Sequence, residues 1–289
     1  MSNTIELAKS FVPKLDECYR LASLTSVLDG APELAKQGAN ANELIIPMMS
    51  MDGLADYSRN GGYVQGGVTM PNETVTCNFD RGRRFAVAVM DALETAGLAF
   101  GRLSAQFVRD KVVPEVDAVR FASYCGISGV TKKEETLGDG AATAAALSAA
   151  VTAMDDEEVT ATGRYLFITP TLLQGINDMD TAKSKKVLEG FERVIKVPQR
   201  RFYTAIKQLS GKTGEEAGGY TKAAGAANIN FAIVQKDALI QYTKHAAPKI
   251  IAPENNPDAD AYVFGYRMVG IAKAYKNMLS GMYFSHDKA

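Results

Sequence analysis

The chain of 289 residues is 46% hydrophobic and 22% charged, a composition typical of a globular protein with one large or two modest cores. Its 32 basic and 33 acidic residues give a net charge of −1, which excludes a protein that coats nucleic acid with a strongly basic surface. No apolar run approaches the roughly 20 residues of a membrane-spanning helix, and the first residues lack a signal-peptide pattern. We therefore expect a soluble protein that is made in the cytoplasm.

Residues 1–45 have the character of an arm. Leu7, Phe11 and Leu15 keep a short helical spacing that Pro13 interrupts, and the stretch that follows reads as irregular chain. A segment with so few apolar anchors needs a neighbouring surface to become ordered.

Residues 46–90 read as a long β-hairpin. Apolar residues alternate with polar ones at strand-like spacing, at Val64, Val68, Val75, Cys77 and Phe79. The sequence "TMPNET" predicts a turn with Pro71 and Asn72 in its middle. Five glycines between Gly53 and Gly67 make the first strand flexible. Because an isolated hairpin of this kind is marginal in water, we expect it to lie on a neighbour.

Residues 91–126 predict a long helix. Asp91 fits an N-cap, and Glu94 completes a capping box. The helical spacing of apolar residues runs through Leu93, Ala96, Phe100, Leu103 and Phe107 and continues less strictly at Val116, Val119 and Phe121. Pro114 should kink or divide this helix because proline lacks a backbone donor, and Gly126 is a stop signal.

The remaining residues mix helices and strands. We expect an alanine-rich helix over 139–159, a buried strand over 164–170 with a helix after it, a strand with a turn over 190–202, a surface loop over 208–228, a strand followed by a helix over 229–251, and strand-like chain over 260–286.

Few side chains offer catalytic or metal-binding chemistry. The only histidines are His245 and His286, which is too few for a confident metal site or a histidine-based hydrolase. Cys18, Cys77 and Cys125 match no zinc or redox spacing and are expected to be reduced thiols.

Three motif-like stretches are better explained as structural features. The "GKT" at 211–213 lacks the first glycine of a phosphate loop, whose place Ile206 takes. The "GDGAAT" at 138–143 follows no buried strand and reads as the start of a helix. Asp258 and Asp260 do not have the spacing of a calcium loop.

Two basic clusters remain. The "DRGRRF" sequence carries Arg81, Arg83 and Arg84, which could hold a phosphate, clamp a carboxylate or pin one subunit to another. Arg200 and Arg201 lie near Tyr203 and Lys207; such a cluster can bind nucleic acid, but in a neutral chain it favours an intersubunit or solvated face.

Five stretches, in this order, carry a resemblance to a known family: "SMDGLADYSRNGGYVQGGVT", "FDRGRRFAVAVMDALET", "FVRDKVVPEVDAVRFA", "RYLFITPTLLQ" and "INFAIVQKDALIQYTKHAAPKII". Nearly the whole chain resembles the major capsid proteins of tailed bacteriophages, which have the Hong Kong 97 phage-type fold. The resemblance implies an α+β fold divided into an N-terminal arm (1–45), an extended hairpin loop (46–90), a long spine helix of the peripheral domain (91–126), a mixed α/β axial domain (127–227) and a return to the peripheral domain (228–289).

The same resemblance implies a structural protein without enzymatic activity, cofactor or metal. It would assemble as hexamers and pentamers into an icosahedral shell around the double-stranded DNA of a tailed phage or prophage, within the host cytoplasm, and become part of the virion. Its expected partners are itself, a separate scaffolding protein, a portal protein and weakly contacted DNA, with no membrane. The alternatives are a bacterial encapsulin-type nanocompartment shell and a cytosolic nucleotide-binding enzyme.

Intersubunit contacts are expected at the hairpin and at its base. The candidate residues are Asp52, Asp56, Arg59, Asp80, Arg81, Arg83, Arg84, Glu94, Arg200 and Arg201. The acidic partners expected for the three arginines of "DRGRRF" are Asp52, Asp56, Asp80, Asp91 and Glu94, in the same or a neighbouring subunit.

The sequence departs from the resemblance in two ways. Some members of this fold cross-link covalently through a lysine on the extended loop, but no lysine lies between Lys36 and Lys111, so we expect no such cross-link. Only about 45 residues precede the loop, so a fused scaffolding segment is not expected.

Overall fold

A computed structural model describes residues 23–30, 36–37, 43–47, 49–70, 72–90 and 98–288. The chain forms two compact units. One, called the body below, comprises Met1–Gly30 and Phe79–Ala289, and the other, called the hairpin unit, comprises Ala31–Asn78.

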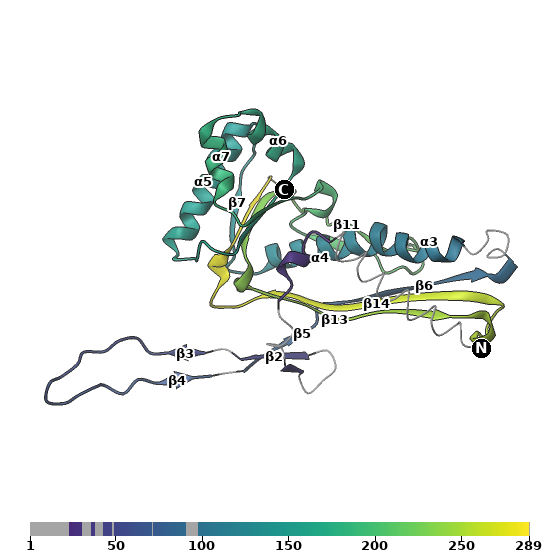
Figure 1. Ribbon diagram of the computed structural model, residues 1–289, viewed down its shortest axis with the longest axis horizontal. Coiled ribbons are helices and arrows are strands. Elements are labelled where there is room, and N and C mark those ends of the chain that lie inside the picture. The colour runs from purple at the N-terminus through teal and green to yellow at the C-terminus, as the bar shows by residue number, and fades with distance from the viewer. Residues whose placement is uncertain are drawn as a thin grey trace. The chain divides into compact units, whose positions relative to one another are not determined.

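The hairpin unit contains short antiparallel strands along two arms (Figure 1). Its strands are β1 (Lys36–Gln37), β2 (Glu43–Pro47), β3 (Ser50–Met51), β4 (Val68–Thr69) and β5 (Asn72–Thr76). β1 pairs with β2, β2 pairs with β5, and β3 pairs with β4. The chain reverses at an isolated bridge between Ser58 and Gly62, where Gly62 has a φ of +74°.

The predicted turn at "TMPNET" is wrong. β4 and β5 follow one another along the same arm, since their partners β3 and β2 both lie on the opposite arm. The reversal lies instead at 58–62, because a tight turn needs a residue that tolerates positive φ and Gly62 supplies it. Pro71 itself lies outside the described residues.

A long three-stranded antiparallel sheet forms one part of the body. Its strands, in spatial order, are β13 (Leu239–Ile251), β14 (Ala261–Ala274) and β6 (Phe79–Ala88). A helical run lies along this sheet (Figure 1), and buried side chains from both fill the space between them, among them Phe79, Val113, Val116 and Phe264.

Two segments differ from the sequence-based expectation here. The extended loop was expected to reach residue 90, but Phe79–Ala88 pairs with β14 over ten residue pairs. The helix expected within 229–251 is wrong, because Leu239–Ile251 is a strand paired along its length with β14. Cross-strand pairing overrides the helix propensity of Ala246 and Ala247. Pro248 is tolerated since β13 is an edge strand with one unpaired side.

The long helix is confirmed over its described part. It consists of α3 (Leu98–Phe107), a π-helical turn (Val108–Val112) and α4 (Val113–Gly126). Pro114 lies in the first turn of α4, directly after the π-helical turn. The helix therefore continues past the proline but changes its hydrogen-bond pattern there, since proline cannot donate. The helix ends at Gly126 as predicted, and its expected start at Asp91 lies outside the described residues.

A five-stranded mixed sheet forms the other part of the body. Its spatial order is β7 (Thr131–Glu134), β15 (Met282–His286), β12 (Ile229–Gln235), β8 (Arg164–Ile168) and β9 (Arg193–Lys196). Three helices lie beside it (Figure 1), namely α5 (Gly140–Asp156), α6 (Pro170–Asp178) and α7 (Ala182–Glu189). β12 and β15 join from beyond residue 227, so the sheet draws on two of the predicted segments.

Both faces of this sheet are buried. Leu166 and Ile233 pack with residues of α5 and α6, whereas Phe167 and Val234 pack with residues of α4. β8 and β12 are buried at every position, which explains why their sequences read as continuous apolar runs. A small hairpin of β10 (Ile206–Gln208) and β11 (Tyr220–Lys222) completes the body.

Candidate functional site

The two motif-like glycine stretches are stabilised by hydrogen bonds within their own segments. In the "GKT" loop, the Ser210 backbone N–H donates to the Glu215 carboxylate at 2.7 Å, and the Gly214 N–H donates to Glu216 at 2.8 Å. The chain's own carboxylates thus occupy donors that a phosphate would need. "GDGAAT" begins α5, where the Asp139 side chain accepts from the Ala142 N–H at 2.7 Å.

Metal and membrane sites are not found among the described residues. Within the described ranges no three His, Cys, Asp or Glu side chains gather as a metal site would require, and none of the helices there is long and apolar enough to cross a membrane. Cys125 is buried, and burial raises the pKa of its thiol, whereas Cys77 is half-buried. Neither cysteine forms a disulfide within the part of the chain that the structure describes.

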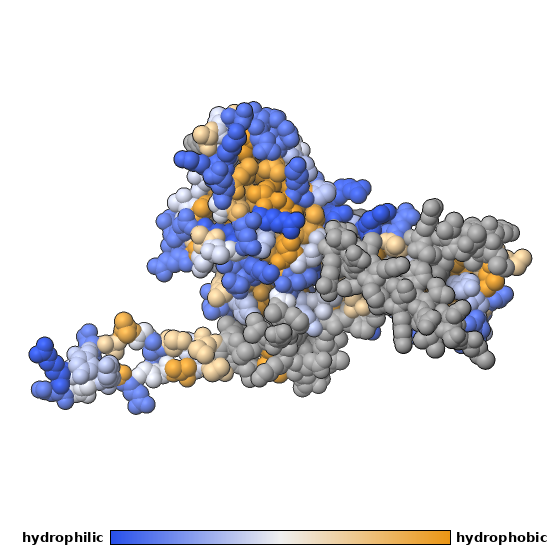
Figure 2. Space-filling model, in the orientation of Figure 1, coloured by the Kyte–Doolittle hydropathy of each residue, from blue (hydrophilic) through white to orange (hydrophobic). Residues whose placement is uncertain are grey.

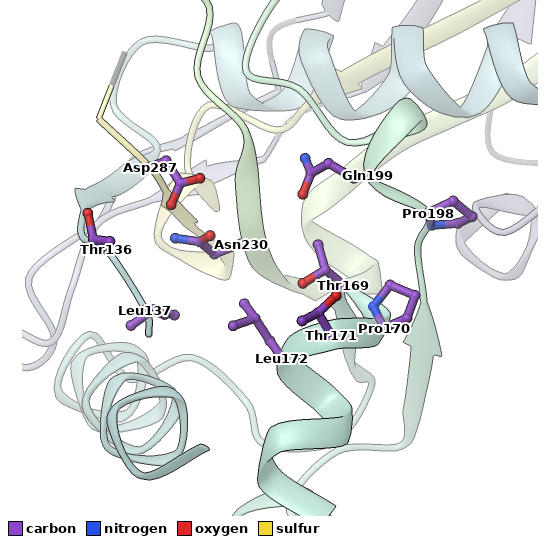
Figure 3. Close-up of a pocket in the computed structure, with 10 residues that line it drawn as sticks. All are labelled: Thr136, Leu137, Thr169, Pro170, Thr171, Leu172, Pro198, Gln199, Asn230 and Asp287. Carbon is purple, nitrogen blue, oxygen red and sulfur yellow. The ribbon is translucent and has the colours of Figure 1, made fainter. Parts of the chain in front are cut away.

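One small pocket lies at the edge of the five-stranded sheet (Figure 3). It has a volume of about 470 Å³, and its lining is Thr136, Leu137, Thr169, Pro170, Thr171, Leu172, Pro198, Gln199, Asn230 and Asp287. Asp287 is the one charged residue of that lining. The other polar groups of the lining are threonine hydroxyls and the side-chain amides of Gln199 and Asn230.

The three arginines of "DRGRRF" lie in β6 and not in a turn. Arg81 and Arg83, two residues apart in a strand, both reach the loop 209–219 that joins β10 to β11. Arg84 instead pairs with Asp258 at 3.4 Å, with both side chains more than half exposed. The arginines therefore hold parts of their own chain.

Arg81 makes the most extensive contacts of the three. Its Nε lies 2.8 Å from the Glu115 carboxylate of α4, and its Nη2 donates to the backbone carbonyls of Leu209 at 2.8 Å and Gly219 at 3.2 Å. One side chain thus joins β6, the long helix and both ends of the loop. Burial raises the pKa of Glu115, and the Arg81 charge and hydrogen bond oppose that rise.

Arg83 binds the middle of the same loop. Its guanidinium donates to the carbonyls of Glu216 at 2.8 Å and Ala217 at 3.3 Å. These partners are neutral, so the charge of Arg83 is not compensated by an acidic side chain there.

Within one chain, the described acidic residues that were expected as partners do not pair with these arginines, and pairing with a neighbouring subunit stays a prediction. Asp80 pairs with Arg267 through two hydrogen bonds of 2.9 and 2.7 Å. Asp52 lies in the hairpin unit, where its carboxylate accepts from the Gly67 N–H at 2.7 Å. Asp56 is exposed. Asp91 and Glu94 lie outside the described residues.

The other predicted contact residues lie in both units. Arg59 is exposed in the turn between Ser58 and Gly62. Arg201 forms an ion pair with the fully buried Asp117 of α4, with its Nη1 3.2 Å from Oδ2. The backbone carbonyl of Arg200 accepts from the Tyr220 hydroxyl at 2.9 Å.

Sequence reasoning missed a buried polar cluster that fixes residues 23–30 to the body. Asp117 accepts from the Ser23 hydroxyl at 2.9 Å and the Thr25 hydroxyl at 2.7 Å. Arg120 donates to Thr25 at 2.9 Å and pairs with Asp29 at 3.2 Å. These bonds give the buried charges hydrogen-bond partners and fix residues 23–30 to α4.

Gln241 of β13 closes this polar cluster. Its amide donates to the Thr25 carbonyl and to the Asp29 carboxylate, each at 2.7 Å, and it accepts from the Tyr124 hydroxyl at 2.6 Å. A signal was present in the sequence, because Asp117 and Arg120 stand among apolar residues of the predicted helix.

The hairpin unit exposes an unusual amount of apolar surface. Figure 2 shows orange and tan atoms along it, interrupted by hydrophilic ones. Its large exposed hydrophobic side chains are Met49, Met51, Leu54, Tyr57, Tyr63, Val64, Val68 and Met70. A concentration of exposed apolar side chains marks a surface that another molecule covers.

The fold is similar to that of solved capsid structures. The asymmetric unit of the bacteriophage PhiM1 mature capsid matches with a TM-score of 0.56 and 8% identity over 85% of this chain and 82% of that chain. The capsid structure of the Cyanophage P-SCSP1u matches with a TM-score of 0.54 and 13% identity over 87% and 85%. The virus-like particle from Pyrococcus furiosus matches with a TM-score of 0.55 and 10% identity over 93% and 98%.

No family model matches the sequence, and no curated protein matches it either. The structural matches cover most of both chains at low identity and therefore show a shared fold. The predicted α+β fold of the Hong Kong 97 phage type is confirmed.

Proposed function

We propose that this chain is the major capsid protein of a tailed bacteriophage or prophage, and that copies of it assemble as hexamers and pentamers into an icosahedral shell. The observation that carries this proposal is the fold, shared along most of the chain with the PhiM1 capsid. In this role the protein is a structural component of the virion and not an enzyme.

The hairpin unit supports an assembling role independently of that likeness. Leu54 is fully exposed, and Tyr63 is 90% exposed. Burying one such side chain stabilises a protein by roughly 1.5–3 kcal/mol, so leaving several in water is costly for a lone subunit. A neighbouring copy that covers the hairpin would remove this cost, and a closed shell repeats the contact by symmetry.

The remaining partners follow from the same role. We propose a separate scaffolding protein, a portal protein and packaged double-stranded DNA that is contacted weakly and without sequence preference. The net charge of −1 supports weak DNA contact, because a strongly basic inner wall would retain DNA by counterion release.

Imaging of the purified protein tests the assembly proposal. The protein, produced alone and together with the proposed scaffolding protein of the same genome, is separated by sedimentation and examined by negative-stain electron microscopy. Closed shells of uniform size are expected when both proteins are present. Protein that stays monomeric under both conditions would contradict a capsid role. Uniform shells from this chain alone would contradict the need for a scaffold.

A nanocompartment shell is the second candidate, because a virus-like particle from Pyrococcus furiosus covers 93% of this chain. The contents of shells purified from the native host distinguish the two roles. Double-stranded DNA together with a portal protein indicates a phage head, whereas an enclosed enzyme without DNA indicates a nanocompartment.

A further inference from the structure

A large groove runs across the body between β6, the long helix and the β10–β11 hairpin. Its volume is about 1000 Å³. Part of its lining is aromatic and apolar: Phe79, Phe85, Phe107, Tyr266 and Met268. Phe85 and Phe107 contact each other edge to face, with ring centroids 4.8 Å apart. Phe79, Tyr266 and Met268 are buried in the core, so the half-buried rings of Phe85 and Phe107 supply the accessible apolar floor of the groove.

The acidic side chains of this groove are already paired. Asp80 binds Arg267, Asp110 binds Arg109 at 3.1 Å, and Glu115 binds Arg81. Arg267 and Arg109 do not line the groove, so they neutralise its acids from outside.

Four cations of the lining form no ion pair with an acidic side chain of the described residues, although the charge of Lys111 acts on the nearby Asp110: Arg83, Lys111, Arg200 and Lys222. Arg83 donates to neutral carbonyls, and Lys222 donates to the Asn228 amide oxygen at 3.0 Å. The groove thus combines apolar side chains with four cations that lie outside any ion pair with a described acid. That combination favours a segment with both carboxylates and large apolar side chains, whereas phosphates of DNA need no apolar floor.

The hairpin unit carries a segment of this chemistry. Within residues 49–57, "MSMDGLADY", Asp52 and Asp56 are the only charged residues, and both are exposed. Leu54 is fully exposed and Tyr57 is 60% exposed. Neither carboxylate forms an ion pair with a described cation, and both are opposite in charge to the four cations of the groove.

We propose that residues 49–57 of one copy occupy this groove on the body of a second copy, with Asp52 and Asp56 facing the four cations and Leu54 and Tyr57 on the aromatic floor. The assignment rests on the proposed assembly of shells and names the surface that covers the hairpin. It goes beyond the general expectation of a loop lying over a neighbour by pairing one acidic segment with one basic groove.

Chemical cross-linking between two differently tagged chains tests this pairing. Both carry Cys18→Ser, Cys77→Ser and Cys125→Ala, which remove the native thiols. One chain carries Asp56→Cys, and the other carries Lys111→Cys, Arg200→Cys or Lys222→Cys in turn. The two chains are assembled together and treated with a short bismaleimide. We expect a cross-linked heterodimer on a denaturing gel for at least one of these three cysteine positions in the groove.

A matched control replaces Asp56→Cys with Asp156→Cys, an exposed carboxylate position at the end of α5, and should give no heterodimer. Closed shells that yield no heterodimer with any of the three groove cysteines would overturn the proposed contact between residues 49–57 and the groove. The proposed function would remain intact. A link formed only within single chains would overturn that contact as well. Failure of the unsubstituted chain to form shells would instead overturn the proposed function, together with the proposed contact between residues 49–57 and the groove.

Charge reversal gives a second readout. Asp56→Lys alone and Arg200→Glu alone should each cause loss of shells, and the double variant should recover them because the attraction is restored with opposite signs. Lys186→Glu, an exposed position on α7, serves as the control and should assemble normally. Arg200→Glu shells that form normally but package less DNA would assign the groove to DNA and overturn the proposal.

Discussion

Arg201 and Asp117 form an ion pair at 3.2 Å although Asp117 is completely buried in the long helix. The pair connects the turn after β9 to α4, and the same carboxylate also holds Ser23 and Thr25. One buried charge therefore fastens the end of the arm and the segment before β10 to the helix.

Removing Asp117 should be costly for subunit stability. Asp117→Ala leaves Arg201 without its carboxylate and leaves several buried donors without an acceptor. We therefore expect a loss of about 3–5 kcal/mol in the free energy of unfolding. Urea denaturation of unassembled subunits measures it. Asp156→Ala, at an exposed position, is the control and should stay within about 0.5 kcal/mol. Equal stability of the two variants would contradict the role of the cluster.

Arg81 should matter more to the loop 209–219 than Arg83 does. Arg81→Ala removes the contacts at both loop ends together with the Glu115 pair, whereas Arg83→Ala removes bonds to the loop middle only. Trypsin cleavage after the exposed Lys212 reports loop opening. Each lost 1.4 kcal/mol raises the open population about tenfold, so cleavage should accelerate most in Arg81→Ala. Arg267→Ala should leave the rate unchanged, and equal rates in all three variants would refute this ranking.

The loop should also loosen in acid. The ion pair with Lys207 and the bond from Ser210 lower the pKa of Glu215 from 4.5 to about 2. A carboxyl with a lowered folded pKa stabilises the fold above its unfolded value and loses that contribution as pH falls. The protection of the Ser210 amide, which is the intrinsic exchange rate of an unstructured amide at the same pH divided by the rate observed at Ser210, should therefore decrease between about pH 4.5 and 2.

Glu215→Gln should remove most of this acid response. Glu216 titrates in the same direction, since the Gly214 N–H lowers its pKa too, so the double variant Glu215→Gln with Glu216→Gln should show none. An unchanged acid response in the double variant would show that other groups control the loop.

Gly140 should not accept a side chain. A methyl group there would overlap the carbonyl oxygen of Gly175, where α5 begins beside α6. Because backbone cannot move aside as a side-chain tip does, Gly140→Ala should cost at least about 1–3 kcal/mol in urea denaturation. Gly138→Ala meets no atom within 4 Å and should be neutral or slightly stabilising. A fully stable Gly140→Ala would contradict the close approach of the two helices.

Assembled shells should contain no covalent links formed through a lysine of the extended loop, residues 46–90. No lysine lies between Lys36 and Lys111, so the hairpin unit beyond Lys36 offers no amine for an amide bond. Denaturing gel electrophoresis of mature shells should show monomers. A ladder of cross-linked species would contradict this prediction.

Local patterns were reliable wherever packing agreed with them. The alanine-rich helix predicted over 139–159 is observed over 140–156, and the buried strand predicted over 164–170 is observed over 164–168, because burial leaves a clear apolar pattern in the sequence. The strand over 239–251 was missed because its conformation depends on β14, which follows it in the chain. The hairpin turn was misplaced because "TMPNET" has turn chemistry, yet strand pairing on both sides of it continues along one arm.

The partners of charged residues were the least predictable feature. Arg81 binds Glu115 and the carbonyls of residues 209 and 219, all far from it in sequence. The sequence could show a cluster of guanidinium groups but not what they touch, since long side chains on a strand reach whichever element tertiary packing brings alongside.

By itself the sequence determined the composition of the cores, the helical and strand periodicities, and the order of segments that resembles a capsid protein. Only the tertiary structure decided that β6 belongs to a sheet of the body, that the arginines grip their own loop, and that Asp117 anchors the arm. The physical reason is the separation in sequence between the residues that contact each other. Periodicity records how each residue meets the core locally, whereas ion pairs and strand partners are chosen by contacts between segments that lie up to about two hundred residues apart.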